Sequence, residues 1–163
     1  MSKEAFALLC AGLVALLALL AALGISLRRR RQRDIAAPLG WADVAPTLVV
    51  PALYVATTRA GQPYERVFAH GLGFRGRTDL AIDAEGAQLL ADRRQVRIPA
   101  DRIRSVERAT WTIDRVVEPG GMLVIAHDLD APVDTYLRII GDDTEALAAL
   151  RALVPAPQEG ATP

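Results

Sequence analysis

Apolar residues follow two different patterns along this chain. From residue 5 to residue 27 they run without a charged residue, which is long enough for one helix to cross a bilayer, since about 20 apolar residues suffice. From Thr47 onwards, short segments alternate between apolar and polar positions, as is typical of half-buried β-strands. The pattern predicts an extracytoplasmic tip over 1–4, a transmembrane helix over 5–27 and a β-rich domain over 47–154.

Six or seven antiparallel strands are predicted in the β-rich domain. The first, Thr47–Thr58, is rich in β-branched residues, and its Pro51 indicates a bulge or an edge position. Between Asp79 and Asp83, Leu80 and Ile82 share one face and both aspartates the other. The next expected strand is Ala87–Ala91. A longer strand begins at Val96 and Ile98 and continues with Ala109, Trp111 and Ile113 on one face. After a turn at Glu118–Gly121, the last two expected strands are Met122–Ala126 and Val133–Ile140, the latter with Val133, Thr135, Leu137 and Ile139 inward.

A helix is predicted to close the domain. Asp142 and Glu145 have the spacing of a capping box, Leu147, Leu150 and Val154 follow at helical spacing, and Pro155 ends the helix. Antiparallel strands followed by one amphipathic helix form an α+β pattern. This pattern is compatible with a small barrel or sandwich whose open end the helix covers. The tail over 155–163 is expected to be disordered because it consists mainly of proline, glycine and polar residues.

Arginines directly after the apolar run indicate its orientation. Basic residues beside a membrane span stay on the cytoplasmic side, so the N-terminus is expected outside and the domain in the cytoplasm, at the plasma membrane. Residues 28–46 are expected to form a basic juxtamembrane segment and a linker. The cluster that meets the membrane surface is Arg28, Arg29, Arg30, Arg31 and Arg33.

Three other interpretations of the N-terminus are less well supported. A cleaved signal peptide has a shorter apolar stretch, of about 7–15 residues, and a small-residue cleavage site, whereas arginines follow this run. A lipoprotein anchor at Cys10 would need small residues where Leu8 and Leu9 stand. A buried helix of a soluble domain would be expected to show a polar face, and this segment has none.

The distribution of charge argues against nucleic-acid binding. The chain is neutral overall, but 18 of its 19 acidic residues and only 13 of its 19 basic residues follow Arg33. A domain with this acidic balance lacks the basic surface that supplies most non-specific affinity for nucleic acids. Cys10 is the only cysteine and lies within the apolar run, so no disulfide and no thiolate site is available to the domain.

Gly71–Gly76 matches the pattern G-x-G-x-x-G, which binds dinucleotides where a helix follows it. Here an alternating segment follows, so a tight loop that enters a strand is the favoured interpretation. Arg66, His70, Arg75 and Arg77 lie in or beside the same loop, and arginine pairs with phosphate through two hydrogen bonds. This set is a candidate site for a small anion or a lipid headgroup. The alternative is that these arginines pair with aspartates on a solvated face and that His70 bonds to backbone.

Metal binding and catalysis are weakly supported. His70 and His127 are the only histidines, and no histidine or cysteine pair has the spacing of metal ligands. Asp128, Asp130 and Asp134 are carboxylates that suggest calcium, but they lack the pattern of an EF-hand. The sequence therefore predicts a protein that is not an enzyme and has no metal or cofactor.

A further set of segments carries a resemblance to a known family: Tyr54–Thr58, Gly61, Glu65–Val67, His70–Arg77, Gly120–Gly121, Asp134–Thr135 and Arg138. With these segments the chain resembles an uncharacterised actinobacterial family whose members look like one membrane helix followed by a bacterial pleckstrin-homology-like (PH-like) domain. The resemblance implies a seven-strand barrel with a capping helix, at the plasma membrane, and assigns no residue a role.

Two functions are expected from this architecture. The first is a membrane-tethered adaptor whose partners are the bilayer and a protein of unknown identity. The second is a lipid or small-anion sensor that uses the arginine-bearing loop, and an accessory role in a transport or export system is a more distant third. Ala18, Ala22 and Ser26 are a loosely spaced candidate for helix pairing, and thus for a homo-oligomer.

Overall fold

The computed structural model describes residues 3–40, 44–91, 94–109 and 121–155. The chain divides into two units, residues 1–34 and 35–163. The first contains helix α1 (Lys3–Arg31), which continues through the apolar run into the arginine cluster. Its segment Leu8–Leu27 has the length and composition of a membrane span, and a signal sequence would meet the same criteria.

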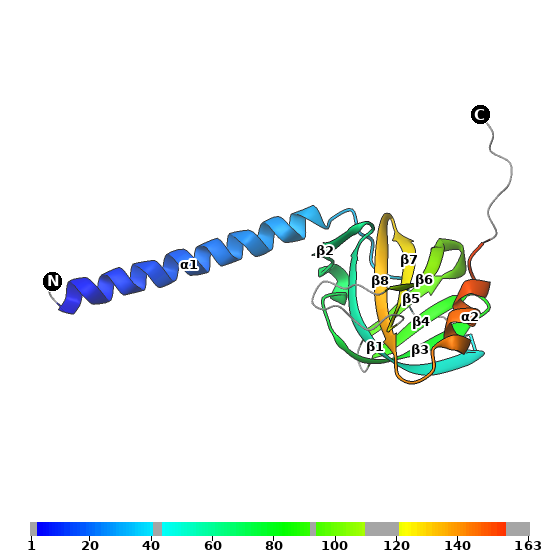
Figure 1. The fold of residues 1–163 in the computed structure, drawn as a ribbon. Helices are drawn as coiled ribbons and strands as arrows, with labels where there is room; N and C mark the ends of the chain where they lie inside the picture. The colour runs from blue at the N-terminus through cyan, green and yellow to red at the C-terminus, as the bar shows by residue number, and fades with distance from the viewer. Residues whose placement is uncertain (1–2, 41–43, 92–93, 110–120, 156–163) are drawn as a thin grey trace, which may run out of the picture. The chain divides into compact units, whose positions relative to one another are not determined.

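The second unit is an antiparallel sheet followed by one helix (Figure 1). Seven strands follow one another in the order β5-β4-β3-β1-β8-β7-β6, and β2 pairs with β1 beside this path. The strands are β1 (Leu48–Arg59), β2 (Gln62–Arg66), β3 (Gly76–Asp83), β4 (Gly86–Ala91), β5 (Arg94–Pro99), β6 (Ile103–Ala109), β7 (Met122–Leu129) and β8 (Ala131–Ile139). Short 3-10 turns η1 (Ala69–Gly71) and η2 (Ala100–Arg102) precede β3 and β6, and α2 (Thr144–Ala152) closes the chain's described part.

The sheet curls around one hydrophobic core, and α2 packs against β1, β3 and β6 (Figure 1). The core is formed by the inward faces of β1 and of β3 to β8, together with Leu147 and Leu150 of α2. Burying these side chains removes apolar surface from water, which is the main favourable term in folding. The predicted combination of an apolar helix, a small antiparallel barrel and a C-terminal helix is thus confirmed, with β2 as an additional short strand.

Alternation along the strands predicts the inward residues well. Val133, Thr135, Leu137 and Ile139 of β8 are all buried, as expected. Leu80 and Ile82 of β3 are also buried. The expected face made by Trp111 and Ile113, and most of the turn at Glu118–Gly121, lie outside the described residues.

Two strand predictions need correction. The long strand expected after Val96 is two strands, because η2 turns the chain between β5 and β6. Pro51 lies in β1, a strand with neighbours on both sides, rather than at a bulge; the bulge against β8 falls between Tyr54 and Ala56. Pairing of β1 with β8 begins only at Ala52, so Pro51 is paired with a residue of β3 alone. The missing N–H of Pro51 therefore removes no hydrogen bond from the pairing of β1 with β8.

The predicted linker also differs from the structure. Ile35 is 1% exposed and belongs to the core. The N–H of Ala36 donates to the carbonyl of Leu129 (2.9 Å), and Leu39 forms an isolated bridge with Arg97 of the edge strand β5. The domain therefore begins at Ile35 and not at Thr47, which the sequence did not indicate because the segment has no periodic pattern.

The capping box is wrong in detail. Helix α2 begins at Thr144, and Asp143, the residue before it, makes no side-chain cap. Asp142 instead accepts hydrogen bonds from the N–H of Thr144 (3.0 Å) and from its hydroxyl (2.7 Å). These bonds hold the pKa of Asp142 below its ordinary value. The same carboxylate thus stabilises the helix start, but from outside the helix.

Candidate functional site

The four residues of the predicted anion site have different roles in the structure. Arg66 donates from Nη2 to the carbonyls of Val55 (3.0 Å) and Phe74 (2.8 Å), and its guanidinium lies 5.7 Å from the centre of the Phe68 ring. It therefore holds the loop after β2 against β1. These main-chain contacts give Arg66 a structural role, and it is not among the residues that line the groove with Arg75 and Arg77.

His70 also serves the fold. Its Nε2 lies 2.9 Å from the carbonyl oxygen of Ile35, so it bonds the segment that enters the core. This is the backbone-bonded loop histidine considered as the alternative in the sequence. The G-x-G-x-x-G pattern is a loop as well: β3 follows it directly, so no helix N-terminus is available for a pyrophosphate.

Glycine is required in this loop for two physical reasons. Gly71 has φ +82°, and a Cβ on Gly73 would lie 2.8 Å from the Phe68 ring. Gly71 thus has a left-handed backbone conformation, which glycine adopts readily. At Gly73 the main chain passes so close to the Phe68 side chain that a larger residue would not fit. The pattern thus reflects loop geometry, as predicted.

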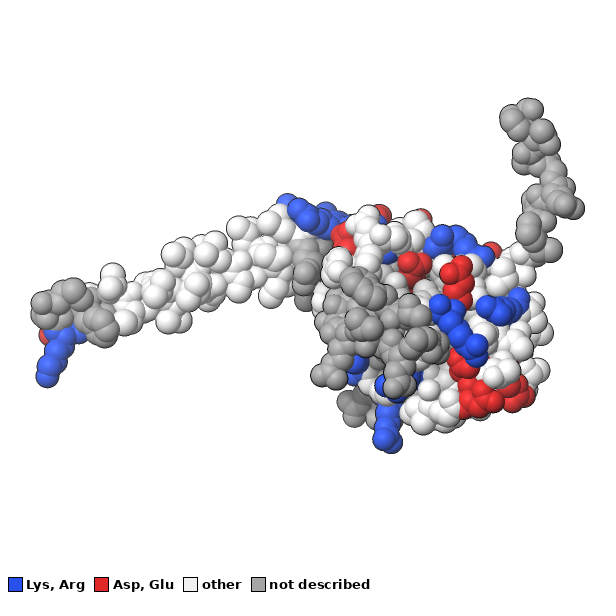
Figure 2. Space-filling view, viewed as in Figure 1, with Lys and Arg blue, Asp and Glu red and all other residues white. Residues whose placement is uncertain are grey.

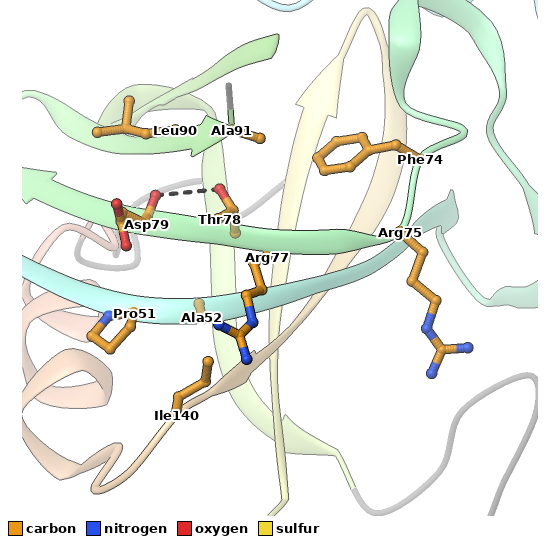
Figure 3. Close-up of a pocket in the computed structure, with 10 residues that line it drawn as sticks. All are labelled: Pro51, Ala52, Phe74, Arg75, Arg77, Thr78, Asp79, Leu90, Ala91 and Ile140. Carbon is orange, nitrogen blue, oxygen red and sulfur yellow. Dashed lines mark hydrogen bonds between the residues drawn. The ribbon is translucent and has the colours of Figure 1, made fainter. Parts of the chain in front are cut away.

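Arg75 and Arg77 are exposed and line an open groove of about 850 Å³ where β1, β3 and β4 meet the chain after β8 (Figure 3). In this view the side chain of Arg77 extends from β3 toward Ile140, whereas Arg75 extends away from it. The lining is Pro51, Ala52, Phe74, Arg75, Arg77, Thr78, Asp79, Leu90, Ala91 and Ile140. The groove therefore combines apolar side chains with two positively charged residues, Arg75 and Arg77, and one carboxylate, that of Asp79.

The Phe74 side chain, which lines this groove, is held in place by the hydrophobic core. The Phe74 ring stacks on the ring of Tyr54, with centroids 4.1 Å apart and planes 9° from parallel. Tyr54 is fully buried, so Phe74 is held by the core. Offset and stacked aromatic pairs contribute beyond their burial, and the groove is consequently largely preformed.

Strand register places Arg138 next to Arg77, which the sequence did not indicate. Leu53 of β1 is directly opposite Arg77 on β3 and Arg138 on β8. All three side chains therefore point to the outer face of the sheet, with the two arginine backbones about 10 Å apart. Neither arginine has an ion pair or side-chain hydrogen bond with a residue that the structure describes. We call Arg138, Leu53 and Arg77 the arginine row.

Five of the described arginines outside the candidate loop pair with acidic residues. Basic and acidic side chains are interspersed on the visible face of the domain, and several acidic ones lie together at its lower edge in this view (Figure 2). The pairs include Arg59 with Glu65 (3.4 Å), Arg102 with Asp130 (3.7 Å), Arg104 with Asp128 (3.2 Å) and Asp134 (3.8 Å), and Arg108 with Asp143. The aspartates considered for calcium are thus ion-paired, and no metal-binding cluster occurs among the described residues.

One ion pair is buried, on the face of β3 where the sequence places both aspartates, opposite Leu80 and Ile82. Asp83 is 2% exposed and accepts from both guanidinium nitrogens of Arg97 (3.0 and 3.2 Å). Burial alone raises the pKa of Asp83, but hydrogen bonds from Arg97, the N–H of Glu85 and Gln88 outweigh it and lower that pKa. Asp79, four residues earlier on the same strand, is exposed.

A chain of buried polar groups crosses the interior of the barrel. Tyr54 donates its hydroxyl proton to the carbonyl of Leu72 (2.9 Å), and a carbonyl only accepts. Thr57 must then donate to Tyr54, Thr135 to Thr57 and His127 to Thr135, each over 2.8 Å. Because each hydroxyl has one proton, this order fixes the neutral Nε2–H tautomer of His127.

Burial keeps that histidine uncharged. His127 is 1% exposed, and desolvation, assisted by the positive charge of Arg104, lowers its pKa to about 3. The same desolvation raises the pKa of Tyr54 to about 12. Both groups therefore stay neutral across the physiological range and act as internal hydrogen-bonding partners.

A curled antiparallel sheet closed by a C-terminal helix defines a small barrel of the PH-like class. Residues 35–154 match the family model described as Bacterial PH domain-like, and the chain belongs to this family. The PH-like part of the resemblance in the sequence is thereby confirmed, and the matched range begins where Ile35 enters the core. A search of curated proteins found no match.

Proposed function

We propose that this protein is a membrane-tethered adaptor: α1 crosses the plasma membrane, and the PH-like domain binds a protein partner at its inner face. The observation that carries the proposal is an anchor-length apolar helix joined to a domain with an open, preformed groove beside exposed arginines. Holding a partner in this way raises its effective concentration near other membrane proteins without new contacts.

The proposed role is non-catalytic. His127 is neutral and bonded inside the barrel, and His70 is bonded to the backbone of Ile35. Both histidines thus serve the fold. The groove combines apolar side chains with two arginines and one aspartate, a composition that suits recognition of a ligand surface.

The orientation of α1 is proposed from the arginine cluster at its C-terminal end, of which Arg30, Arg31 and Arg33 are exposed. To test it, the native Cys10 is replaced by alanine and a cysteine is placed at Glu159. We expect this cysteine to resist an impermeant thiol reagent in intact cells and to react after lysis. Ready labelling of intact cells would reverse the topology.

The adaptor role is tested by cross-linking in living cells, detergent purification of the full chain and identification of the proteins recovered. A shortened chain of residues 34–163 serves as the comparison. We expect one protein in near-equal amount with both chains, in the membrane fraction with the first and in the soluble fraction with the second. Recovery of no protein, or a specific enzymatic activity of the purified chain, would contradict the proposal.

The second candidate is a sensor of lipid headgroups or small anions, which the exposed Arg75 and Arg77 favour. It predicts that the full chain in zwitterionic nanodiscs binds inorganic phosphate or vesicles containing phosphatidylglycerol. Arg75→Ala and Arg77→Ala together would abolish that binding. Unchanged binding in the double variant would exclude this loop as the anion site.

A further inference from the structure

We infer that the partner presents an extended acidic segment, with a bulky apolar side chain next to its carboxylates, to the arginine row and the adjoining groove. This inference rests on the proposed adaptor function and specifies its binding surface. The positive charge of the arginine row is the first observation that supports it. Arg77 and Arg138 are exposed and without partners in the described part of the chain. Yet this domain has an excess of acidic residues, and five of its described arginines pair with them: Arg59, Arg97, Arg102, Arg104 and Arg108.

The apolar residues around the two arginines are the second observation that supports an acidic partner segment with an apolar side chain. Leu53 lies between the two arginines, Ile140 is 47% exposed beside them, and Pro51 and Leu90 line the groove. A guanidinium binds a carboxylate through two parallel hydrogen bonds. An apolar side chain placed over Leu53 or Ile140 would shield those bonds from water, as the surroundings of an interface hot spot do.

Asp79 sets the direction of the segment. It lies two residues after Arg77 on the same face of β3, and it is opposite Pro51 on β1 and Leu90 on β4. Positions two apart on a strand are about 7 Å apart. An acidic residue of the partner is therefore accepted at Arg77 and repelled at Asp79, where an apolar or basic residue fits.

These observations favour a protein segment over a membrane. An anionic bilayer is attracted by clustered basic residues, whereas here Asp79 lies beside Arg77 and residues 34–163 hold five more acidic than basic residues. Arg75 and Arg77 also extend in different directions (Figure 3), so they do not converge on one phosphate. A segment with separate carboxylates and an apolar side chain matches the row better.

The experiment selects short random peptides displayed on phage against the full chain in nanodiscs of zwitterionic lipid. We expect sequences with Asp or Glu beside Leu, Ile or Phe. Binding of the synthesised peptide is then measured by fluorescence anisotropy. Arg77→Glu and Arg138→Glu should each weaken binding by about tenfold or more, because like charges are then opposed.

Matched variants separate the surface from general charge. Arg102→Glu reverses an arginine that does not line the groove and makes one loose pair with Asp130 (3.7 Å), so it should leave the affinity within about twofold. Replacing the peptide carboxylate by lysine should weaken binding to the wild type and restore binding to Arg77→Glu. Arg77→Gln, which adds no repulsion, should fall between wild type and Arg77→Glu.

Several results would overturn the inference. They are the failure to enrich any peptide, enrichment without acidic residues, equal losses in Arg102→Glu and Arg77→Glu, and binding of phosphatidylglycerol vesicles with the same arginine dependence. The adaptor function fails separately. If cells yield a stoichiometric partner whose recovery is unchanged by both charge reversals, the adaptor stands and this surface is wrong; if the wild type yields no partner, the adaptor itself is wrong.

Discussion

Burial of His127 makes the stability of the PH-like domain depend on pH above the range in which its carboxylates titrate. In the folded domain the pKa of His127 is about 3, whereas the ordinary value is 6.5. Between these values the unfolded chain binds a proton that the folded domain does not. Stability is therefore complete above about pH 6.5 and is lost progressively as the pH falls toward 3.

The size of the effect follows from this difference in pKa. Each unit of pKa corresponds to about 1.4 kcal/mol. Lowering the pH from 7 to 5 should thus reduce the free energy of unfolding by about 2 kcal/mol, a large part of the 5–15 kcal/mol typical of a domain. Asp83 adds nothing in this interval, because its pKa lies below 3.8.

The assay is urea unfolding of the full chain in detergent, followed by pulse proteolysis at pH 7 and pH 5. His127→Gln keeps an N–H donor for Thr135 but does not titrate, so its stability should change much less between the two values. Equal slopes in wild type and His127→Gln would refute the reasoning.

Two further predictions concern the packing of the domain. Asp83→Ala removes the buried carboxylate that Arg97 binds and leaves beside it only the more exposed carboxylate of Glu85 (3.4 Å), so it should lower the free energy of unfolding by about 3 kcal/mol. Asp79 on the same strand is exposed, so Asp79→Ala should change that free energy by about 0.5 kcal/mol or less; equal losses would contradict the buried ion pair. Gly86→Ala places a Cβ 2.3 Å from the carbonyl oxygen of Ile98, so it should lower the free energy of unfolding by about 1–3 kcal/mol. The Cβ of Gly76→Ala meets no atom within 4 Å, so this control should leave the free energy of unfolding nearly unchanged. Urea midpoints measure both pairs, and a stable Gly86→Ala protein would show that β4 and β5 shift apart easily.

Local patterns were sufficient to predict most elements of the fold. The apolar run, the alternation in β3 and β8 and the spacing of Leu147 and Leu150 each reflect neighbours within a few residues. The start of the domain at Ile35 was missed because its contacts, Leu129 and His70, are distant in sequence. Burial of Asp83 was missed for the same reason, since Arg97 is on another strand.

The candidate site was only partly predictable. The sequence identified the arginine-bearing loop, but it grouped Arg66 and His70 with Arg75 and Arg77. The carbonyls that hold the first two belong to Val55, Phe74 and Ile35, and tertiary structure decides such contacts. Arg138 joins Arg77 only through pairing of β1 with β8 across the length of the domain, which no local periodicity reveals.

Photo-cross-linking in living cells tests whether the arginine row contacts a protein partner at the membrane. A photoreactive amino acid is placed at Ile140, beside the arginine row, or at Ala148, an exposed position on α2. We expect one protein adduct from Ile140 in the membrane fraction, lost when Arg77→Glu is added, and none from Ala148. Adducts with lipid alone, equal adducts from both positions, or an Ile140 adduct that survives the charge reversal would contradict it.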